Sequence, residues 1–300
     1  MTVRDKALFV IPLVPLAAIL LAALVAPGLA TAKGLPALAV GFGVIFLLNY
    51  AGGVHSYLKQ TEQFFDLAGS LSFVAATLVA LWASGLDLRA MLAAVMILVW
   101  TSRLGWFLFR RVRAVGYDTR FADLLHDFRM IFMTWTLQAA WVALTVSCGL
   151  VAILSTSSKP IGLVEIAGVA IWATGFAVEV VADQQKQRFR RNPENHGQFI
   201  QTGLWSRSQH PNYFGEMTLW VGVAVFALPV LEGWQLLTLA SPVFVIYLMM
   251  RVSGADMLDA QAEARWGDDP AFRRYRETVP RIVPRLRDHR PLSPRPTRSP

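Results

Sequence analysis

The chain has 300 residues, of which 55% are hydrophobic and 16% are charged. Soluble domains carry about 25% charged residues, and a soluble fold could not bury this much apolar surface. The composition therefore excludes an ordinary soluble protein and predicts an integral membrane protein. The net charge of +8 does not indicate a nucleic-acid partner, because the basic residues gather in a few segments between apolar runs, as in the cytoplasmic loops of membrane proteins.

Eight apolar runs follow one another along the chain, bounded by charged residues, Pro or Gly. A helix needs about 20 mainly apolar residues to cross the hydrocarbon core of a bilayer, and each run is close to that length. The runs are Ala7–Leu29, Leu35–Ser56, Asp66–Ser84, Leu88–Phe109, Met130–Leu154, Gly162–Ala182, Asn212–Val230 and Trp234–Met250. Pro229 and Gly233 predict the tight turn of a helical hairpin between the last two runs. We expect an all-α polytopic bundle of seven or eight transmembrane helices.

Basic residues are concentrated in three segments: residues 110–129, residues 186–210 and the C-terminal region. With eight spans all three lie on one side of the membrane, which the positive-inside rule makes cytoplasmic. We expect both termini on that side. Residues 285–300 are rich in Pro and Arg and are predicted to be disordered, whereas residues 1–284 are predicted to form a single transmembrane domain.

Several ionisable residues lie inside or at the ends of the apolar runs. A charged side chain within a membrane helix costs about 2.5 to 3.5 kcal/mol, so each of these residues is a candidate functional residue. Asp66 opens the third run, Arg103 lies within the fourth, Asp183 follows the sixth and Glu216 belongs to the start of the seventh. The alternative is that each side chain merely reaches the polar interface from a helix end.

Helical spacing places some of these residues on shared faces. Glu179 and Asp183 are four residues apart, as are Asn212 and Glu216. The loop between the two pairs carries four cations suited to phosphate groups, namely Lys186, Arg188, Arg190 and Arg191. This pattern predicts a cytoplasmic site for an amphiphilic ligand with an anionic end. Loop arginines that are simply bathed in solvent are the alternative.

Familiar cofactor and metal motifs are absent from the sequence. There is no GxGxxG between a strand and a helix, which excludes a Rossmann domain, and there is no P-loop. The five His residues are scattered, and no His/Cys cluster of the zinc type is present. We therefore expect no metal, and a nicotinamide cofactor would need a site of another architecture.

A family resemblance is carried by GLWSRSQHPNYFGEMTLWVG at residues 203–222 and VSGADMLDAQAEARWGDDPAFRRYRETVPRIVP at residues 252–284. Both resemble the C-terminal region of bacterial membrane members of the steroid 5-alpha-reductase family, and the similarity covers about residues 64–284. Sterol-ring reductases and isoprenylcysteine carboxyl methyltransferases carry segments similar to HPNYFGE. The pairing of Asn212 with Glu216, and of Asp183 with Arg190, favours the reductase branch.

The resemblance implies that the protein binds NADPH in a bacterial inner membrane. Asn212 and Glu216 match residues that contact the nicotinamide end of the cofactor. Contacts along the ribose and phosphates would come from Asp183, Arg190 and Arg103. The predicted cofactor-binding set also includes His210 and Tyr213 from the same motif, and Arg111, which lies on one helical stripe with Arg103.

Asp66 and Trp100 are the predicted catalytic residues. In the steroid-reducing members of the family, an acid on one helix and a Tyr on a later helix polarise the ketone oxygen of the substrate. Asp66 and Trp100 have the spacing of that pair. Trp100 stands in place of the Tyr, so it could donate only through its indole N–H.

The leading hypothesis is an NADPH-dependent reductase of a C=C bond conjugated to a carbonyl, in a steroid-like or other lipid substrate. Asp66, in its protonated form, would donate a hydrogen bond to the carbonyl oxygen while hydride reaches the β-carbon. One alternative is an S-adenosylmethionine-dependent lipid methyltransferase of the isoprenylcysteine type, and another is a non-catalytic sterol- or lipid-binding protein. The expected partners are the lipid or steroid substrate and membrane lipids, with no nucleic acid and no partner protein.

Overall fold

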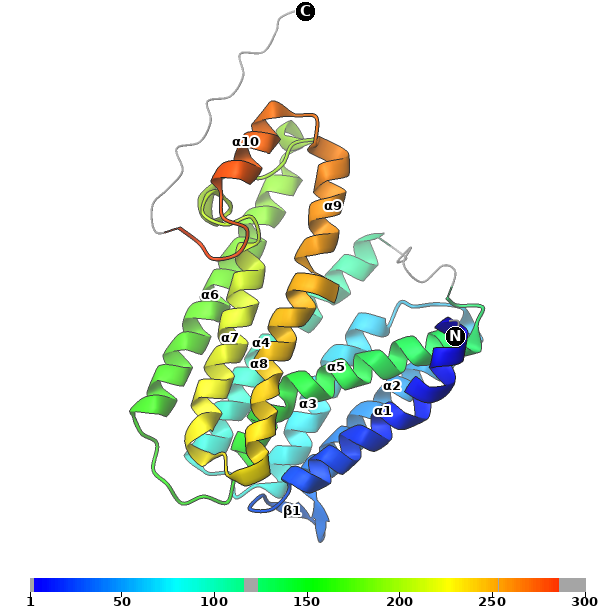
Figure 1. Cartoon of the computed structure of the whole chain (residues 1–300), viewed down its shortest axis with the longest axis vertical. Coiled ribbons are helices and arrows are strands. Elements are labelled where there is room, and N and C mark those ends of the chain that lie inside the picture. The colour runs from blue at the N-terminus through cyan, green and yellow to red at the C-terminus, as the bar shows by residue number, and fades with distance from the viewer. Residues whose placement is uncertain (1–2, 116–123, 253, 286–300) are drawn as a thin grey trace, which may run out of the picture. The chain divides into compact units, whose positions relative to one another are not determined.

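A computed structural model describes residues 3–115, 124–252 and 254–285, with only the backbone described at residues 3–4 and 107–115. These residues are almost entirely helical (Figure 1). Eight of their helical segments are long and apolar enough to cross a membrane: Asp5–Val25, Ala37–Lys59, Phe65–Ala83, Leu88–Trp106, Phe128–Leu154, Leu163–Arg191, Pro211–Val230 and Gly233–Trp266. The prediction of an all-α polytopic bundle is confirmed, and the chain is an integral membrane protein. Its orientation stays a prediction.

The elements follow one another with short connections. The α-helices are α1 (Val3–Val25), α2 (Ala37–Lys59), α3 (Phe65–Ala83), α4 (Leu88–Val115), α5 (Phe128–Leu154), α6 (Leu163–Arg191), α7 (Pro211–Ala227), α8 (Ala240–Tyr247), α9 (Ala255–Trp266) and α10 (Pro270–Thr278). Short 3₁₀ helices cover Pro193–Asn195, Gly203–Ser206, Leu228–Val230 and Gly233–Leu239, and a π-helical turn covers Leu248–Val252. The antiparallel strands β1 (Thr31–Ala32) and β2 (Leu35–Pro36) pair Ala32 with Leu35. The Lys33-Gly34 turn between them has φ of +50° and +83°, as in tight hairpins.

The residues group into two compact units. The first contains residues 1–169 and 223–242, and the second contains residues 170–222 and 243–300. The division cuts through α6, through α7 and through α8. The prediction that residues 1–284 act as a single catalytic domain stays a prediction, and most of the predicted tail, residues 286–300, lies outside the described residues.

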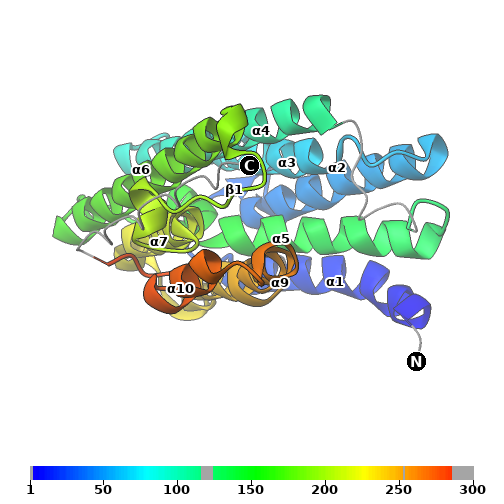
Figure 2. The ribbon, with the colours of Figure 1, turned by 90° about the horizontal axis from the view of Figure 1, so that it is seen from above.

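Helix α5 is the centre of the first unit. It contacts α1, α2, α3 and α4, and it runs between α1 on one side and α2 and α3 on the other (Figure 2). Its Trp135 is completely buried and packs so closely on α2 that a Cβ added at Gly52 would lie 2.4 Å from the indole ring. Small residues on α2 therefore allow the large ring of α5 to enter, as is common between membrane helices.

A proline in α1 explains one polar contact of this unit. Pro15 has no N–H, so the backbone oxygen of Ile11 loses its ordinary partner within the helix. The hydroxyl of Tyr50, from α2, donates to that oxygen at 2.9 Å. Thr136 Oγ1, from α5, lies 3.3 Å from the same hydroxyl oxygen. One polar cluster thereby joins three helices.

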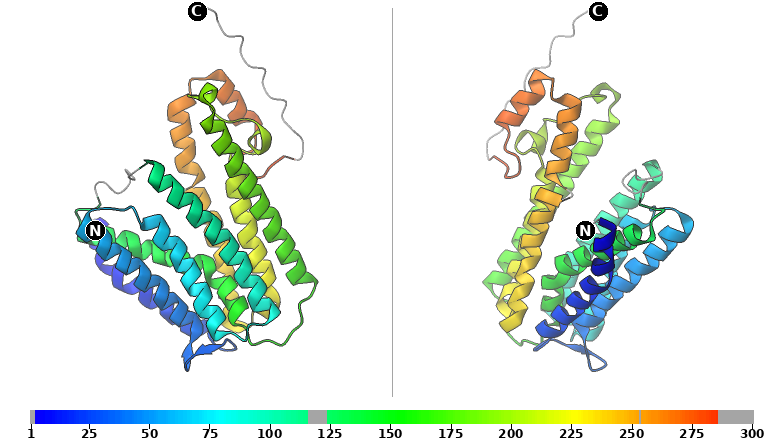
Figure 3. Two further views of the ribbon diagram at one scale, coloured as in Figure 1. Left: turned by 180° about the vertical axis from the view of Figure 1, so that it is seen from behind. Right: turned by 45° about the vertical axis from the view of Figure 1, so that its right-hand side comes forward.

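Helices α6 and α7 run side by side in the second unit (Figures 1 and 3). Gly175 of α6 faces Gly215 of α7. A Cβ added at Gly215 would lie 2.6 Å from the backbone nitrogen of Glu179 and 2.7 Å from the backbone oxygen of Gly175. The two backbones are thus in direct contact beside Glu216, which the sequence analysis assigned to the cofactor site.

The end of α6 corrects one expectation. The apolar run was predicted to stop at Ala182 and to be followed by a basic loop, but the helix continues to Arg191. Gln, Lys and Arg are good helix formers, and nothing breaks the helix before Pro193. Lys186 and Arg190 therefore lie on a helix, not in a loop. Helices α9 and α10 follow the eighth apolar run and were not predicted from the sequence.

Replacement of Gly215 by Ala is expected to lower the melting temperature, because the new methyl group would press against backbone atoms that cannot move aside. Overpacking of this kind costs about 1 to 3 kcal/mol. Gly43→Ala is the matched control, since no heavy atom lies within 4 Å of a Cβ added at that position of α2. Thermal melting of both variants in one detergent checks the prediction, and equal melting temperatures would contradict the close packing of α6 on α7.

Candidate functional site

A cavity of about 440 Å³ lies within the second unit. Its walls come from the end of α6, from residues 195–200, from the segment around Trp205 and His210, and from α9 and α10. Six of the lining residues are aromatic: Phe189, Phe199, Trp205, Trp266, Phe272 and Tyr275. Four are permanently or usually cationic: Lys186, Arg190, Arg265 and Arg276. The cavity therefore combines flat apolar surface with positive charge.

The aromatic side chains form one packed cluster. Phe199 is the centre of it, with ring centroids 5.2 Å from Phe272, 5.4 Å from Tyr275 and 6.1 Å from Trp266. Edge-on and tilted contacts of this kind hold rings in fixed orientations. The cluster thus offers a preformed surface on which a planar heteroaromatic group could stack.

Trp205 is anchored in the cavity wall by two hydrogen bonds. Its indole Nε1 donates to the backbone oxygen of Ala182 at 3.0 Å, and its own backbone oxygen accepts from the Tyr275 hydroxyl at 2.8 Å. The Nζ of Lys186 lies 4.5 Å from the centroid of the Trp205 ring, which is within the range of a cation–π interaction. A cation from α6 is thereby held at the cavity wall.

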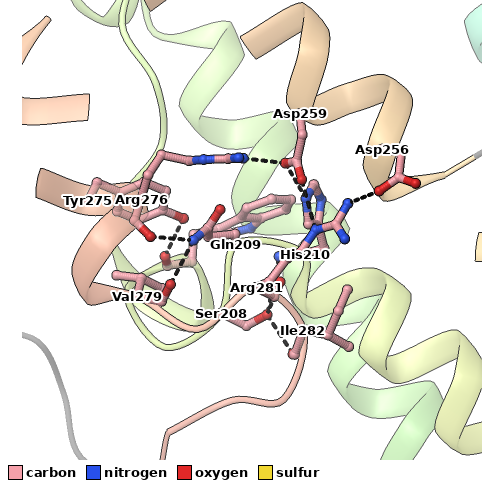
Figure 4. Close-up of polar contacts among 11 residues, drawn as sticks. Ser208, Gln209, His210, Asp256, Asp259, Tyr275, Arg276, Val279, Arg281 and Ile282 are labelled. Atoms are coloured by element: carbon pink, nitrogen blue, oxygen red, sulfur yellow. Dashed lines mark hydrogen bonds and ion pairs between the residues drawn. The ribbon is translucent and has the colours of Figure 1, made fainter. Parts of the chain in front are cut away.

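His210 lies at the start of α7 and lines the cavity. Its Nε2 is 2.9 Å from Asp259 Oδ1 (Figure 4), and its ring stacks on that of Tyr213 with centroids 5.6 Å apart. Burial lowers the pKa of His210 below its usual range, although Asp259 acts in the opposite direction. The lowered pKa favours the neutral imidazole, in which Nε2–H donates to the Asp259 carboxylate and Nδ1 is an acceptor.

Asp259 is the shared acceptor of a charged network. Besides His210, it accepts from Arg276 Nη1 at 2.5 Å and from Arg281 Nε at 2.8 Å. Arg281 also donates to Asp256 through Nη2 (Figure 4), and the two carboxylates hold the pKa of Arg281 above its usual range. The described residues that line the cavity include four cations and one carboxylate, that of Asp259, so this acid does not cancel the positive charge of the cavity wall.

The segment after α10 holds the backbone that leads into His210. The backbone N–H groups of Gln209 and His210 donate to the backbone oxygens of Pro280 and Arg281, at 2.9 and 3.1 Å. Ser208 Oγ donates to Ile282 O at 2.7 Å (Figure 4). These bonds resemble a short strand pairing and fix His210 from outside its own helix.

Two of the sequence-predicted cofactor residues of the second unit line this cavity. Arg190 and His210 line it, and Lys186 lies within electrostatic reach of His210. Tyr213 lies within electrostatic reach of Glu216 and Asp183. Asn212 lies in the first turn of α7, directly before Tyr213. The assignment of these residues to one cofactor site stays a prediction.

The other predicted residues belong to the first unit. Asp66 lies in the first turn of α3, and Trp100 and Arg103 lie in α4. Trp100 is only 1% exposed, and its ring meets the Phe73 ring edge-on at 5.2 Å. Arg111 belongs to α4, but its side chain lies outside the part of the chain that the structure describes.

Residues 54–279 match the family described as "Protein of unknown function (DUF1295)". The chain belongs to this family. It is also 29% identical, over 174 residues, to a Delta(14)-sterol reductase of Methylotuvimicrobium alcaliphilum, a match that covers 51% of this chain and 35% of that protein. A Delta(14)-sterol reductase of Saccharomyces cerevisiae is 32% identical over 111 residues, which are 34% of this chain and 22% of that protein. No solved structure matches the chain.

This DUF1295 protein therefore spans about a third or less of the length of the curated relatives that it matches. The similarity to Delta(14)-sterol reductases is distant, and these proteins are related to the steroid 5-alpha-reductase superfamily. The sequence-based resemblance is thus confirmed at the level of sterol reductases. Closer placement within the steroid 5-alpha-reductase family stays a prediction.

The charged network of this DUF1295 protein, formed by Asp259, Arg276 and Arg281, was not predicted from the sequence. One signal could have found the first of them: Asp256 and Asp259 are three residues apart in a strongly basic region, so a helix would place both on one face among potential arginine partners. The expected absence of a metal stays a prediction. Among the residues that the structure describes, no group of three or more His, Cys, Asp or Glu could hold a metal ion.

Asp259→Ala is expected to lower the melting temperature, because it leaves His210 and two arginines without their shared acceptor. Leaving a buried donor unsatisfied costs about 1 to 3 kcal/mol. Asp268→Ala is the control: its carboxylate is fully exposed and makes one long contact with Arg273 at 3.4 Å, and exposed pairs contribute about 0 to 1 kcal/mol. Both variants would be melted side by side, and a drop no larger for Asp259→Ala than for Asp268→Ala would show that the network does not hold the site.

Proposed function

We propose that this protein is an NADPH-dependent membrane reductase of a C=C bond conjugated to a carbonyl, acting on a steroid-like or other lipid. The observation that carries the proposal is the cavity of the second unit, which combines an aromatic wall with Lys186, Arg190 and Arg276. The distant similarity to Delta(14)-sterol reductases supports a membrane reductase of a sterol-like lipid, and conjugation of the C=C bond to a carbonyl is the further part of the proposal.

The residues of the cavity fit a nicotinamide dinucleotide. A volume of about 440 Å³ is in the range of cavities that hold cofactors. Phosphate groups would be bound by cations such as Lys186 and Arg190, and arginine suits such contacts because its guanidinium forms paired hydrogen bonds with oxyanions. Phe199 and its aromatic neighbours would stack on the adenine ring. The Nδ1 atom of His210 would accept from a ribose hydroxyl or an amine.

The nicotinamide end of the cofactor would be held by Asn212 and Glu216. Asp183 would contribute contacts along the ribose and phosphates, and Tyr213 would support His210 through the stacked rings. A cofactor contact of Arg103, which belongs to the first unit, stays a prediction. NADPH, when bound, supplies the hydride for the reaction. The task of these side chains is to bind the cofactor and to orient its nicotinamide ring.

Asp66 would act on the substrate. When hydride is added to the β-carbon, the electron pair of the C=C bond moves toward the carbonyl oxygen, and a proton from water then joins the α-carbon as the carbonyl re-forms. Asp66, in its protonated form, donates a hydrogen bond to that oxygen as its negative charge grows, and Trp100 would be a second donor through its indole N–H. The aromatic rings of Phe73, Trp100 and Trp141, which meet edge-on in α3, α4 and α5, would provide an apolar wall for a lipid.

NADPH is expected to raise the melting temperature of the detergent-solubilised protein, because a ligand at 100 times its Kd stabilises the folded state by about 2.7 kcal/mol. Asn212→Ala and Glu216→Ala should reduce that increase, whereas Glu277→Ala, on the exposed side of α10, should not. If S-adenosylmethionine stabilises the protein and NADPH does not, the methyltransferase alternative holds instead. If both predicted variants keep the full NADPH effect, this start of α7 is not the cofactor site.

Asp66→Leu is expected to slow the single-turnover oxidation of NADPH by about a hundred- to a thousandfold, as is typical when a preorganised donor to a developing oxyanion is lost. Asp66→Asn, which keeps a donor, should retain part of the rate. The probes are progesterone, 4-cholesten-3-one and trans-2-hexadecenal, which all carry a C=C bond next to a carbonyl. The proposal is contradicted if the parent protein oxidises NADPH with none of them.

A role in helix capping makes a different prediction for the same variants. The N-cap residue of α3 is Phe64, not Asp66. A purely structural Asp66 would change the melting temperature of the protein and leave the rate of the folded fraction intact. An unchanged single-turnover rate for Asp66→Leu would therefore remove Asp66 from the active site.

A further inference from the structure

Gln138 places a buried amide in the middle of α5, within the first unit. The residue is only 5% exposed. A primary amide inside a membrane helix is unfavourable unless a polar partner within the protein meets it, since hydrocarbon offers none. Gln138 Nε2 donates to the backbone oxygen of Phe65, at 2.7 Å. The partner of the amide is thus the first residue of α3, directly before Asp66.

The first turn of α3 has no cap of its own. Its N-cap residue, Phe64, makes no side-chain capping hydrogen bond, whereas helices usually begin with a Ser, Thr, Asp or Asn that does. Contacts from α5 reach this turn at a backbone oxygen and at a side chain, not at the N–H groups that a cap would bind. In addition to the bond from Gln138, the Phe65 ring meets the Trp135 ring edge-on with centroids 5.0 Å apart. Neighbouring turns of α5 therefore hold the first residue of α3 by its backbone and by its side chain.

Gly69 provides the space for this amide. A Cβ added there would lie 2.8 Å from Gln138 Nε2, so a larger residue on α3 would displace the amide from Phe65. The next residue, Ser70, donates from Oγ to the backbone oxygen of Asp66 at 3.2 Å. Side chains therefore hold the backbone oxygens of two consecutive residues, the second of which is the proposed catalytic acid.

The other polar atom of the amide has no such partner. Gln138 Oε1 is buried and accepts no hydrogen bond within the described part of the chain. A residue needed only to fill this space would be better as Leu or Met, which would bury no unpaired acceptor. The one thing that Gln138 provides and an apolar side chain of its size does not is the bond to Phe65.

We propose that Gln138 is a positioning residue for the reduction, which fixes the first turn of α3 so that Asp66 meets the substrate oxygen in one geometry. The inference rests on the proposed function of Asp66. Misplacement of a catalytic group by about 1 Å can lower a rate by about a hundredfold. Gln138 would exert its effect on turnover through Asp66, without contact with the cofactor.

Hydrogen–deuterium exchange tests the structural half of this proposal on the full-length protein in detergent, without any ligand. Gln138→Leu is expected to speed the exchange of the backbone amides of residues 66–70 by about tenfold, as the loss of one hydrogen bond would. Thr145→Val is the matched control, because it removes another buried polar group two turns further along α5, and it should leave these amides unchanged. If Gln138→Leu exchanges at the parent rate, the inference is overturned.

Single-turnover NADPH oxidation, with whichever enone probe the parent reduces fastest, tests the catalytic half. Gln138→Leu should lower the rate constant about tenfold to a hundredfold, while the melting shift caused by NADPH and the probe concentration for half-maximal rate stay at parent values. Gln138→Glu should recover much of the rate at low pH, where a protonated carboxyl can donate to the Phe65 oxygen, and should lose it as the pH rises and that carboxyl ionises.

The outcomes separate this inference from the proposed function. If Asp66→Leu is slow but Gln138→Leu turns over at the parent rate, Asp66 keeps its role and the positioning role of Gln138 is overturned. If Asp66→Leu itself turns over at the parent rate, the proposed function of Asp66 fails, and the inference fails with it even where the exchange of residues 66–70 is faster.

Discussion

The hydrocarbon core of a membrane contains no water, and this constraint decides most of what holds the first unit together. Every polar group placed there needs a partner within the protein. Buried charges at the helix ends follow the same rule: Arg89, in the first turn of α4, and Glu165, in the first turn of α6, are 4% and 2% exposed and pair at 3.1 Å. A second contact from Arg89 reaches the backbone oxygen of Lys159 at 2.7 Å. Breaking such a pair by removing one partner is strongly unfavourable, because the other charge is then left buried. The polar contacts therefore determine which helices can be neighbours.

Backbone oxygens are the commonest partners in this unit. Tyr50 donates to the oxygen that a proline in α1 leaves without an N–H, and Asn49 Nδ2 donates both to Ile45 O at 2.8 Å and to Ser72 Oγ at 3.0 Å. These bonds are specific in register, because a shift of one residue along either helix would separate donor from acceptor. Dispersion between close-packed helices supplies the attraction. The polar contacts select one register in which the helices can pack. Gln138 makes the same kind of bond, from a side chain to a backbone oxygen, next to the proposed catalytic acid Asp66.

The second unit uses charge in another way. Its cavity is built from the ends of helices and from short connecting segments, and its acid, Asp259, is surrounded by donors from three elements. A single carboxylate among several cations orders His210 and leaves an excess of positive charge. A binding surface for an anionic ligand needs both properties, because ordering lowers the cost of binding and the excess charge provides the attraction.

The sequence by itself determined the membrane class and the spans, because the length of an apolar run is a local property that the thickness of the bilayer imposes. Local spacing also predicted shared helix faces for Glu179 with Asp183 and for Asn212 with Glu216, since positions four apart can be counted along the chain. Only the tertiary structure decided which distant residues form hydrogen bonds with one another. His210 and Asp259 are 49 residues apart, and Gln138 and Phe65 are 73 apart, so no periodicity links them. Such pairs exist only because packed helices bring distant residues together in an interior where an unpaired polar group is too costly to keep.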